Sequence, residues 1–297
     1  MNIPNLFIIG APKSGTTSIY YQLSCHPEIF CPNIKEPKYF ASDIYYDDPK
    51  DYPFKTLTEY LKIYDNKESS FSKFRVDGTV FVMYSINSIK NILTLNENAK
   101  FILILRDPLE ASKSMHNQRL KSYNNSLREV SDDFYICWDY LKIRKLGSGY
   151  PLNCKNKFLF RYDLLYRYEL YLPQIQRLVS RDNLLFINYN NIKNNITKVH
   201  QEIFSFLKIS NYNLPLKVLN KKKGFKNTIS NKIIFFLINN CPRILKKNLF
   251  IRKNIKLLKF VLNFLIKKNV IEKNKKKDAE IKLFFKKSYE TMFKIFN

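Results

Sequence analysis

Short apolar runs alternate with amphipathic stretches from the start of the chain to about residue 210. Residues 5–10, 100–105 and 183–189 are apolar runs of strand length. Helical spacing of apolar positions predicts helices over 15–25, 54–65, 84–95, 158–179 and 196–207, and another from about Leu109. Buried strands in alternation with helices predict an α/β fold with a mostly parallel sheet flanked by helices. Ligands of such sheets bind beyond the carboxyl ends of the strands.

Two further stretches have patterns of their own. Five prolines between residues 26 and 53 predict loop-rich structure there, and residues 75–79 are a candidate strand-to-turn segment. From Lys221 onward the chain is polybasic with amphipathic helical segments. We therefore predict an α/β domain over residues 1–225 and a basic helical part over 226–297, which packs on that domain or extends it.

The first apolar run ends in a loop suited to binding an anion. Residues 10–18 read Gly-Ala-Pro-Lys-Ser-Gly-Thr-Thr-Ser, between a predicted strand and a predicted helix. Backbone N–H groups in such a loop and the positive end of the following helix favour phosphate. The side chains that add a charge or a hydroxyl group are those of Lys13, Ser14, Thr16 and Thr17.

The loop differs from a Walker A loop in the place of its lysine. Gly10 and Gly15 have the Walker spacing, but Thr16 stands at the lysine position and the only lysine of the loop is Lys13. We therefore expect the loop to hold a 5′-phosphoryl group without a triphosphate chain. The alternative is a glycine-containing turn that binds no ligand.

A second candidate phosphate site follows the run at residues 100–105. Arg106 stands at the end of this predicted strand, Pro108 suits a first helical turn, and Ser114 falls within the next two turns. An arginine fork and a hydroxyl group suit a phosphate, although an Arg–Asp surface turn would have the same sequence. Because Lys13, Arg106 and Tyr189 all follow predicted strands, we expect them at one edge of the sheet.

Together the two motifs resemble those of the sulfotransferases that use 3′-phosphoadenosine 5′-phosphosulfate (PAPS). Residues 13–17 match the 5′-phosphosulfate loop of that family, and Arg106 with Ser114 matches its clamp on the 3′-phosphate. Tyr189 matches a tyrosine near the adenine, although Asn190 and Asn191 replace an acidic pair often found there. The resemblance covers residues 5–225 and implies that PAPS is held by Lys13, Ser14, Gly15, Thr16, Thr17, Arg106, Ser114, Tyr189, Lys222, Lys223 and Gly224. The last three residues resemble a basic-glycine loop that is longer in the family, and a solvated lysine run is their alternative.

The resemblance also implies the catalytic groups. Lys13, with Lys35 as a second candidate, would meet the sulfuryl oxygens, and no metal is required. The small-molecule branch of the family uses a histidine between the two phosphate motifs, and this chain has none between His26 and His116. The carbohydrate branch, which includes the heparan sulfate sulfotransferases, uses a glutamate in a Lys-Glu-x-x-Phe-Phe-like stretch. Residues 35–40, Lys-Glu-Pro-Lys-Tyr-Phe, resemble that stretch, so Glu36 is the expected base.

Two qualifications follow from the same residues. Glu36 could instead form a loop salt bridge with Lys35 or Lys38. Many carbohydrate-branch members carry Glu-Lys-Ser/Thr-Pro after the base, whereas residues 77–80 here read Asp-Gly-Thr-Val without a lysine. Either Lys35 assists alone or the acceptor differs.

The net charge indicates which classes of partner to expect, and the cysteines indicate the compartment. The formal charge is +26, and residues 221–297 contribute +18 of it with 22 Lys/Arg and 4 Asp/Glu. Such a surface favours acidic partners, namely an acidic polysaccharide, a membrane surface or, less favoured, nucleic acid. Five cysteines without metal-ligand spacing indicate a reducing compartment. The absence of a signal-peptide pattern and of long apolar runs predicts a cytoplasmic protein, with peripheral attachment to an acidic membrane as an option.

The function predicted from the sequence is therefore sulfuryl transfer from PAPS to a hydroxyl or amine, on a carbohydrate or glycolipid acceptor. An enzymatic alternative is a P-loop kinase or NTPase. A non-enzymatic alternative is a basic nucleic-acid or membrane-surface binder that works through residues 221–297.

Overall fold

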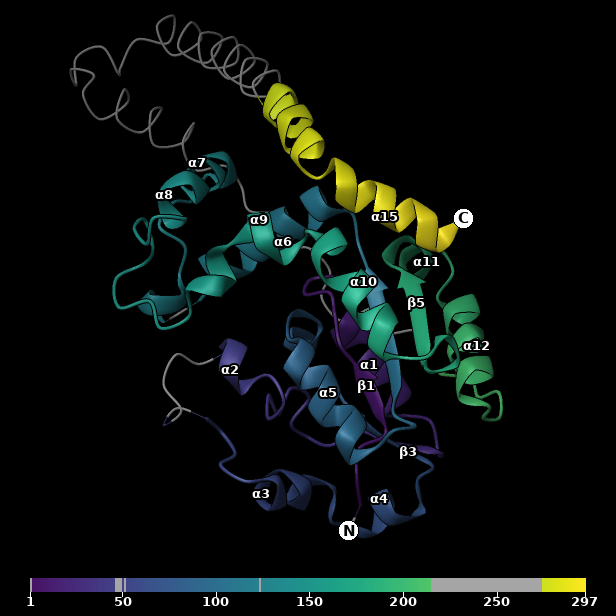
Figure 1. Ribbon diagram of the computed structural model, residues 1–297. Helices are drawn as coiled ribbons and strands as arrows, with labels where there is room; N and C mark the ends of the chain where they lie inside the picture. The colour runs from purple at the N-terminus through teal and green to yellow at the C-terminus, as the bar shows by residue number, and fades with distance from the viewer. Residues whose placement is uncertain (1, 46–49, 51, 123, 215–273) are drawn as a thin grey trace, which may run out of the picture. The chain divides into compact units, whose positions relative to one another are not determined.

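The sheet is the centre of the molecule. The computed structural model describes residues 2–45, 50, 52–122, 124–214 and 274–297 (Figure 1). Within these residues, five strands form one sheet in the order β2-β3-β1-β4-β5, and every neighbouring pair is parallel. The strands are β1 (Leu6–Ile8), β2 (Ile29–Phe30), β3 (Phe74–Asp77), β4 (Lys100–Leu105) and β5 (Leu184–Asn188). The predicted α/β fold is confirmed.

Burial on both faces explains why the central strands are continuous apolar runs. β1 and β4 pair with Phe7 opposite Phe101, and these two rings stack at 5.5 Å on one face. On the other face, Leu6 and Ile8 lie in a core that also includes Ile19 and Ile203. A strand covered on both faces needs apolar side chains at every position, and therefore shows no alternation.

Helices cover the two faces of the sheet. α1 (Thr16–Leu23) and α12 (Ile196–Leu207) share the core of Leu6 and Ile8. Other helices of at least six residues are α5 (Ile86–Leu95), α6 (Pro108–Leu120), α7 (Phe134–Asp139), α10 (Tyr168–Leu178), α11 (Tyr189–Asn194) and α15 (Lys286–Phe296). Shorter helices are α2 (Ser42–Tyr45), α3 (Leu57–Leu61), α4 (Lys67–Phe71), α8 (Leu141–Arg144) and α9 (Tyr162–Leu165).

The prediction of one helix over residues 158–179 is wrong. The segment consists of a 3-10 turn (Lys157–Phe160), α9 and α10. The backbone leaves the helical region at Arg161 (φ −92°, ψ 69°) and Arg167 (φ −87°, ψ 73°). At each break the arginine side chain forms a 2.8 Å ion pair with the residue two positions later, Arg161 with Asp163 and Arg167 with Glu169.

The last helix packs against the sheet domain. The compact unit that contains the sheet comprises Met1–Leu219 and Lys282–Asn297. In it, α15 contacts α10 and β5, Tyr289 donates a hydrogen bond to Asp107 (3.1 Å), and Ser288 donates one to Glu169 (2.6 Å). Of the second unit, Asn220–Ile281, residues 274–281 are described and are helical. The predicted boundary at residue 225 lies outside the described residues and stays a prediction.

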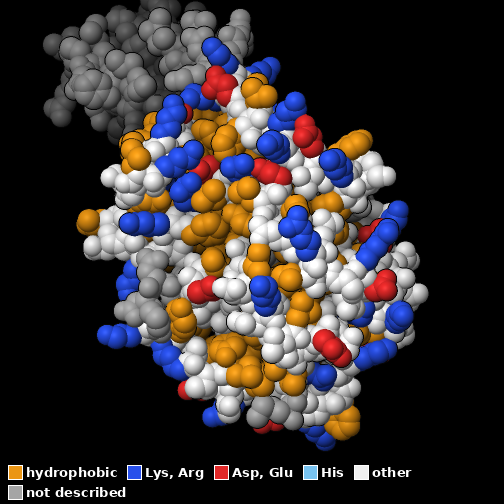
Figure 2. All heavy atoms as spheres, in the orientation of Figure 1, with side chains coloured by type: hydrophobic (Ala, Val, Ile, Leu, Met, Phe, Trp, Pro, Cys, Tyr) orange, Lys and Arg blue, Asp and Glu red, His pale blue; other side chains and the backbone are white. Residues whose placement is uncertain are grey.

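Charge on the visible surface is dispersed. Figure 2 shows Lys and Arg side chains spread over this face of the molecule among apolar side chains, rather than gathered in one patch. In the described part of the chain, no helix combines the length and the apolar character that a membrane span requires.

Candidate active site

The loop between β1 and α1 is held at the carboxyl end of the central strands. Ile9 and Ala11 donate backbone hydrogen bonds to Ile102 (3.0 Å) and Ile104 (2.7 Å) of β4. Gly10 has a φ of 146°, and a Cβ there would lie 2.3 Å from Met83 Sδ. Only glycine therefore fits at this end of β1.

The N-terminus of α1 is open to an anion. Gly15 is the N-cap residue with a φ of 88°, no side chain caps the helix, and its first turn contains no acidic residue. The backbone N–H groups of the first turn consequently lack a side-chain acceptor. Thr16 is buried, and Thr17 is half-buried.

Arg106, Lys13 and Tyr189 come together from three segments. Arg106 Nη1 donates to the Lys13 carbonyl oxygen at 2.9 Å, and the guanidinium carbon lies 4.5 Å from the centroid of the Tyr189 ring. The same ring reaches Gly15, where a Cβ would lie 3.2 Å from Tyr189 Cε2. The expected convergence at one sheet edge is present. Ser114 lies half-buried on the second turn of α6.

Two tyrosines support this arrangement from the segment where α9 ends and α10 begins. Tyr166 donates to the Pro12 carbonyl (3.3 Å), and Tyr168 donates to the Arg106 carbonyl (2.9 Å). The sequence pattern alone predicts only a tyrosine-rich helical face for them. Their role depends on the break between α9 and α10, which periodicity did not reveal.

Ser14 provides a test of whether an anion fits the loop. Its residue is fully buried, and its hydroxyl oxygen forms no hydrogen bond to a described residue. The neighbouring Tyr168 hydroxyl interacts with it but donates its own proton to Arg106. A buried hydroxyl group without a partner is costly, and a phosphoryl oxygen would supply one. The loop therefore fits a phosphoryl group.

Lys13 is a half-buried cation among other cations. Burial, followed by the charges of Arg119, Arg106 and Lys121, lowers the pKa of Lys13 to about 8, while the Glu36 carboxylate opposes this effect. Its backbone lies in the left-handed region with a φ of 65°. A bound anion would stabilise the protonated lysine.

Glu36 and Lys35 form an ion pair next to this loop. Lys35 Nζ lies 2.7 Å from Glu36 Oε1 and also donates to the Gly78 carbonyl at 3.1 Å. The Glu36 side chain is 29% exposed, whereas that of Lys35 is only 10% exposed. The salt bridge anticipated as the alternative thus exists, and it leaves the carboxylate partly accessible and within electrostatic reach of Lys13.

The segment that lacks the family's lysine has a structural role. Thr79 Oγ1 accepts a hydrogen bond from the Lys38 backbone (3.0 Å), and Gly78 donates to the Lys35 carbonyl (3.0 Å). Asp77 is buried and accepts bonds from Tyr60 (2.7 Å) and Thr79 (2.8 Å). Burial raises the pKa of Asp77. These contacts fix the position of the loop that carries Glu36.

The histidines are held by structural hydrogen bonds. The Nε2 atoms of His26, His116 and His200 lie 3.0 Å from Ser210 O, Ser131 O and Gln22 Oε1, respectively. None of these contacts joins the loop around Lys13. In the part of the chain that the structure covers, no three His, Cys, Asp or Glu side chains are grouped as metal ligands.

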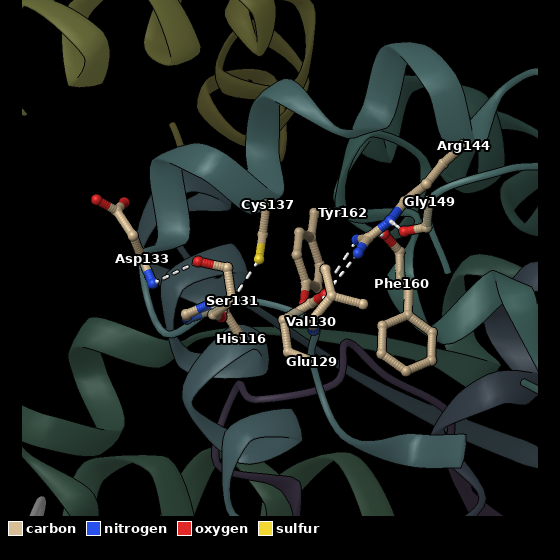
Figure 3. Close-up of polar contacts among 10 residues, drawn as sticks. All are labelled: His116, Glu129, Val130, Ser131, Asp133, Cys137, Arg144, Gly149, Phe160 and Tyr162. Atoms are coloured by element: carbon tan, nitrogen blue, oxygen red, sulfur yellow. Dashed lines mark hydrogen bonds and ion pairs between the residues drawn. The ribbon is translucent and has the colours of Figure 1, made fainter. Parts of the chain in front are cut away.

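A buried ion pair fixes the segment that follows α6. The Glu129 carboxylate lies between the Arg144 guanidinium and the Tyr162 hydroxyl, and both ion-pair side chains are fully buried (Figure 3). Arg144 also donates to the carbonyls of Gly149 (2.9 Å) and Phe160 (3.1 Å). Two residues after Glu129, Ser131 accepts the contact from His116 of α6.

Two groups of residues remain outside this description. Lys222, Lys223 and Gly224 lie outside the described residues, so their contact with a donor stays a prediction. Arg119, in contrast, is not among the residues predicted from the sequence. It is buried near the end of α6, where its only sequence signal is a charge in phase with the inward positions Ser112, Met115 and His116.

Comparison with known proteins identifies the family. Residues 4–256 match the sulfotransferase domain. The chain therefore belongs to the sulfotransferase family, and the match extends beyond residue 225.

Three relatives are carbohydrate-type or membrane-associated enzymes by name. Membrane-associated sulfotransferase kil1 of Dictyostelium discoideum is 35% identical over 115 residues, 39% of this chain and 23% of the relative. Carbohydrate sulfotransferase 15 of Mus musculus is 22% identical over 271 residues, which cover 76% of this chain and 47% of the relative. Bifunctional heparan sulfate N-deacetylase/N-sulfotransferase 4 of Mus musculus is 24% identical over 228 residues, which cover 75% of this chain and 24% of the relative. The chain thus spans less than half the length of each of these relatives.

A solved structure has the same fold. The sulfotransferase from Alicyclobacillus acidocaldarius superimposes with a TM-score of 0.62 at 19% identity, over 80% of this chain and 93% of that one.

Proposed function

We propose that the protein transfers a sulfuryl group from PAPS to a hydroxyl or amine of a carbohydrate or glycolipid acceptor. The observation that carries the proposal is the convergence of Arg106, Lys13 and Tyr189 around an uncapped helix N-terminus. Two anion sites of this kind suit a nucleotide with phosphoryl groups at its 5′ and 3′ positions.

The donor-binding residues divide between these two sites. The backbone of residues 13–17, the Ser14 hydroxyl and the Lys13 ammonium hold the 5′-phosphosulfate. The Arg106 guanidinium and the Ser114 hydroxyl hold the 3′-phosphate, and Tyr189 lies against the nucleoside. The buried Ser14 hydroxyl supports this assignment, because its oxygen forms no hydrogen bond to a described residue.

The chemistry requires charge stabilisation and a base. The bond from sulfur to the donor's bridging oxygen breaks, a bond from sulfur to the acceptor atom forms, and the acceptor loses a proton. Lys13 neutralises charge on the sulfuryl and bridging oxygens, with Lys35 as its assistant. Glu36 accepts the proton, since it is the partly exposed carboxylate within reach of Lys13.

The carbohydrate class of acceptor is supported by the Lys-Glu-Pro-Lys-Tyr-Phe stretch and by the names of the two Mus musculus relatives. The name of the Dictyostelium relative supports peripheral attachment to a membrane, which we retain as a prediction for a cytoplasmic enzyme. Binding of the purified chain to anionic lipid vesicles, compared with neutral ones, tests that attachment.

Calorimetry with the desulfated product PAP tests the function directly. The wild-type chain should bind PAP, and Arg106→Ala should weaken binding by about tenfold or more because it removes a charge-assisted fork. Arg177→Ala, at an exposed site on α10, is the matched control and should bind normally. A wild-type chain that binds ATP but neither PAP nor PAPS would replace the proposal with a P-loop kinase or NTPase.

A further inference from the structure

The C-terminal helix α15 reaches the part of the domain that holds Arg106. Residues 282–297 belong to the compact unit of the sheet, although residues 220–281 separate them from the rest of it in sequence. The helix contacts α10 and β5, and Figure 1 shows it running above α10 toward α11. Phe285, the N-cap residue of α15, is fully buried, and its ring lies 5.5 Å from that of Trp138. The helix is therefore anchored on the same unit as the candidate donor site.

Two adjacent residues of α15 donate hydrogen bonds to carboxylates of this unit. The Tyr289 hydroxyl donates to Asp107 Oδ2 at 3.1 Å, and the Ser288 hydroxyl donates to Glu169 Oε2 at 2.6 Å. Ser288 is fully buried, and Tyr289 is half-buried. Burial, followed by the charge of Asp107, raises the pKa of Tyr289. The tyrosine hydroxyl therefore keeps its proton at neutral pH and donates it to Asp107.

Both acceptors are direct sequence neighbours of residues that hold the backbone of Arg106. Asp107 follows Arg106, and its other carboxylate oxygen accepts from the Glu110 N–H at 2.9 Å, which caps α6. Glu169 follows Tyr168, whose hydroxyl donates to the Arg106 carbonyl at 2.9 Å. The two bonds from α15 thus fix the residue that follows each partner of the contact between Arg106 and Tyr168.

The orientation of the Arg106 guanidinium depends on this backbone. The residue is 8% exposed, and its Nη1 already donates to the Lys13 carbonyl at 2.9 Å. An arginine fork binds a phosphate strongly only when it is held in one orientation, and a shift of about 1 Å is enough to weaken the contact. Without the Tyr289 hydroxyl, one oxygen of Asp107 loses its donor, and the turn from β4 into α6 gains conformational freedom.

We propose that Tyr289 and Ser288 are positioning residues for Arg106, so that the C-terminal helix sets the affinity for the 3′-phosphate of the donor. The inference rests on the proposed function and gives α15 a part in the same site. Each side chain acts through the carboxylate to which it donates and does not touch the donor. The effect falls on the 3′-phosphate because the 5′ loop is held separately, by the hydrogen bonds of Ile9 and Ala11 to β4.

Calorimetry on the full chain with PAP and with adenosine 5′-phosphate (AMP), which lacks the 3′-phosphate, tests the proposal. Tyr289→Phe removes only a hydroxyl group and should weaken PAP binding by about three- to tenfold, while AMP binding stays within about twofold of wild type. Ser288→Ala should change the two affinities in the same directions. Tyr150→Phe is the matched control, because it also removes a tyrosine hydroxyl bond, that to the Arg144 carbonyl at 2.9 Å, and should change neither affinity.

A double-mutant cycle shows whether Tyr289 acts through Arg106. Arg106→Ala removes the fork itself, so the addition of Tyr289→Phe to this variant should cause no further loss of PAP affinity. Equal losses in the wild-type and Arg106→Ala backgrounds would overturn the proposal.

Thermal unfolding separates a positioning role from a structural one. A fall in the Tm of Tyr289→Phe with unchanged PAP affinity would assign the contact to folding alone and overturn the proposal. Equal losses of PAP and AMP affinity would overturn it too, because the effect would then not concern the 3′-phosphate. If the wild-type chain binds no PAP at all, the proposed function itself fails.

Discussion

The guanidinium of Arg106 lies over the ring of Tyr189, 4.5 Å from its centroid. The contact joins the end of β4 to the first turn of α11, and it holds the arginine where Lys13 also binds it. Tyr189→Leu removes the ring face and should weaken PAP binding roughly 5- to 30-fold, as expected for a cation–π contact of about 1–2 kcal/mol. Tyr189→Phe retains the face and should bind PAP almost as wild type. If calorimetry gives the Tyr189→Leu and Tyr189→Phe variants the same PAP affinity, the ring does not position Arg106.

PAP binding should depend on pH through Lys13. The pKa of Lys13 is lowered to about 8 in the free protein by burial and by Arg119, Arg106 and Lys121. An anion favours the protonated form, so binding raises this pKa and takes up a proton. PAP affinity should therefore fall as pH rises through about 8, with uptake of about half a proton per PAP at that pH.

Calorimetry in buffers with different ionisation enthalpies measures this uptake. Lys13→Arg keeps a permanent charge and should flatten the pH profile. Proton release on binding, or an unchanged profile in the variant, would contradict the assignment to Lys13.

Glu36→Gln should separate binding from transfer. The variant loses the base but keeps a side chain of similar shape, so the affinity for PAP should stay near wild type. Sulfuryl transfer should fall by about 100- to 10,000-fold, the usual contribution of general base catalysis. Turnover assays with labelled PAPS provide the measurement. If Glu36 only pairs with Lys35, Glu36→Gln and Lys35→Gln should instead lower stability alike and leave turnover of the folded fraction intact.

Gly15 and Gly147 offer a matched pair. Both have a positive φ, 88° and 90°, but a Cβ at Gly15 would lie 3.2 Å from Tyr189, whereas Gly147 has open space. Alanine at either position should cost about 1 kcal/mol of unfolding free energy or more through backbone strain. Only Gly15→Ala should also weaken PAP binding, because it displaces Tyr189. Urea unfolding and calorimetry on both variants check this, and equal PAP affinity in both would exclude the contact.

The Glu129–Arg144 pair should be important for stability. Glu129→Gln leaves a buried guanidinium without its counter-charge and should destabilise the protein by about 3–5 kcal/mol. Glu290→Gln breaks the exposed pair with Lys286 (4.0 Å) and should cost less than about 1 kcal/mol. Similar losses in the two variants, measured by urea unfolding, would contradict the role of burial.

The sequence predicted the parts of the fold that carry strong local patterns. β1, β4 and β5 are apolar runs, and parallel pairing alone brings the residues that follow them, Lys13, Arg106 and Tyr189, to one edge. β2 has two residues in a proline-rich stretch, too few for a period to be visible. Its place depends on pairing with β3, which is a long-range contact.

Arg119 could not be found because α6 does not have a clear apolar face. Its buried positions include Ser112, His116 and Arg119, so its inward face carries polar and charged side chains as its outward face does. Which side of such a helix faces the site depends on contacts made elsewhere, such as that of His116 with Ser131.

The helix α6 also acts as a spacer of fixed length. Ser114, proposed for the donor's 3′-phosphate, and Arg119, whose charge acts on Lys13, are five positions apart, about 7.5 Å along the axis. Substrates can be longer or shorter, but this offset cannot change while the helix is intact. One residue inserted between the two positions would rotate Arg119 by about 100° around the axis relative to Ser114. The register of a single helix thus couples the proposed 3′-phosphate contact to the positive charges around Lys13.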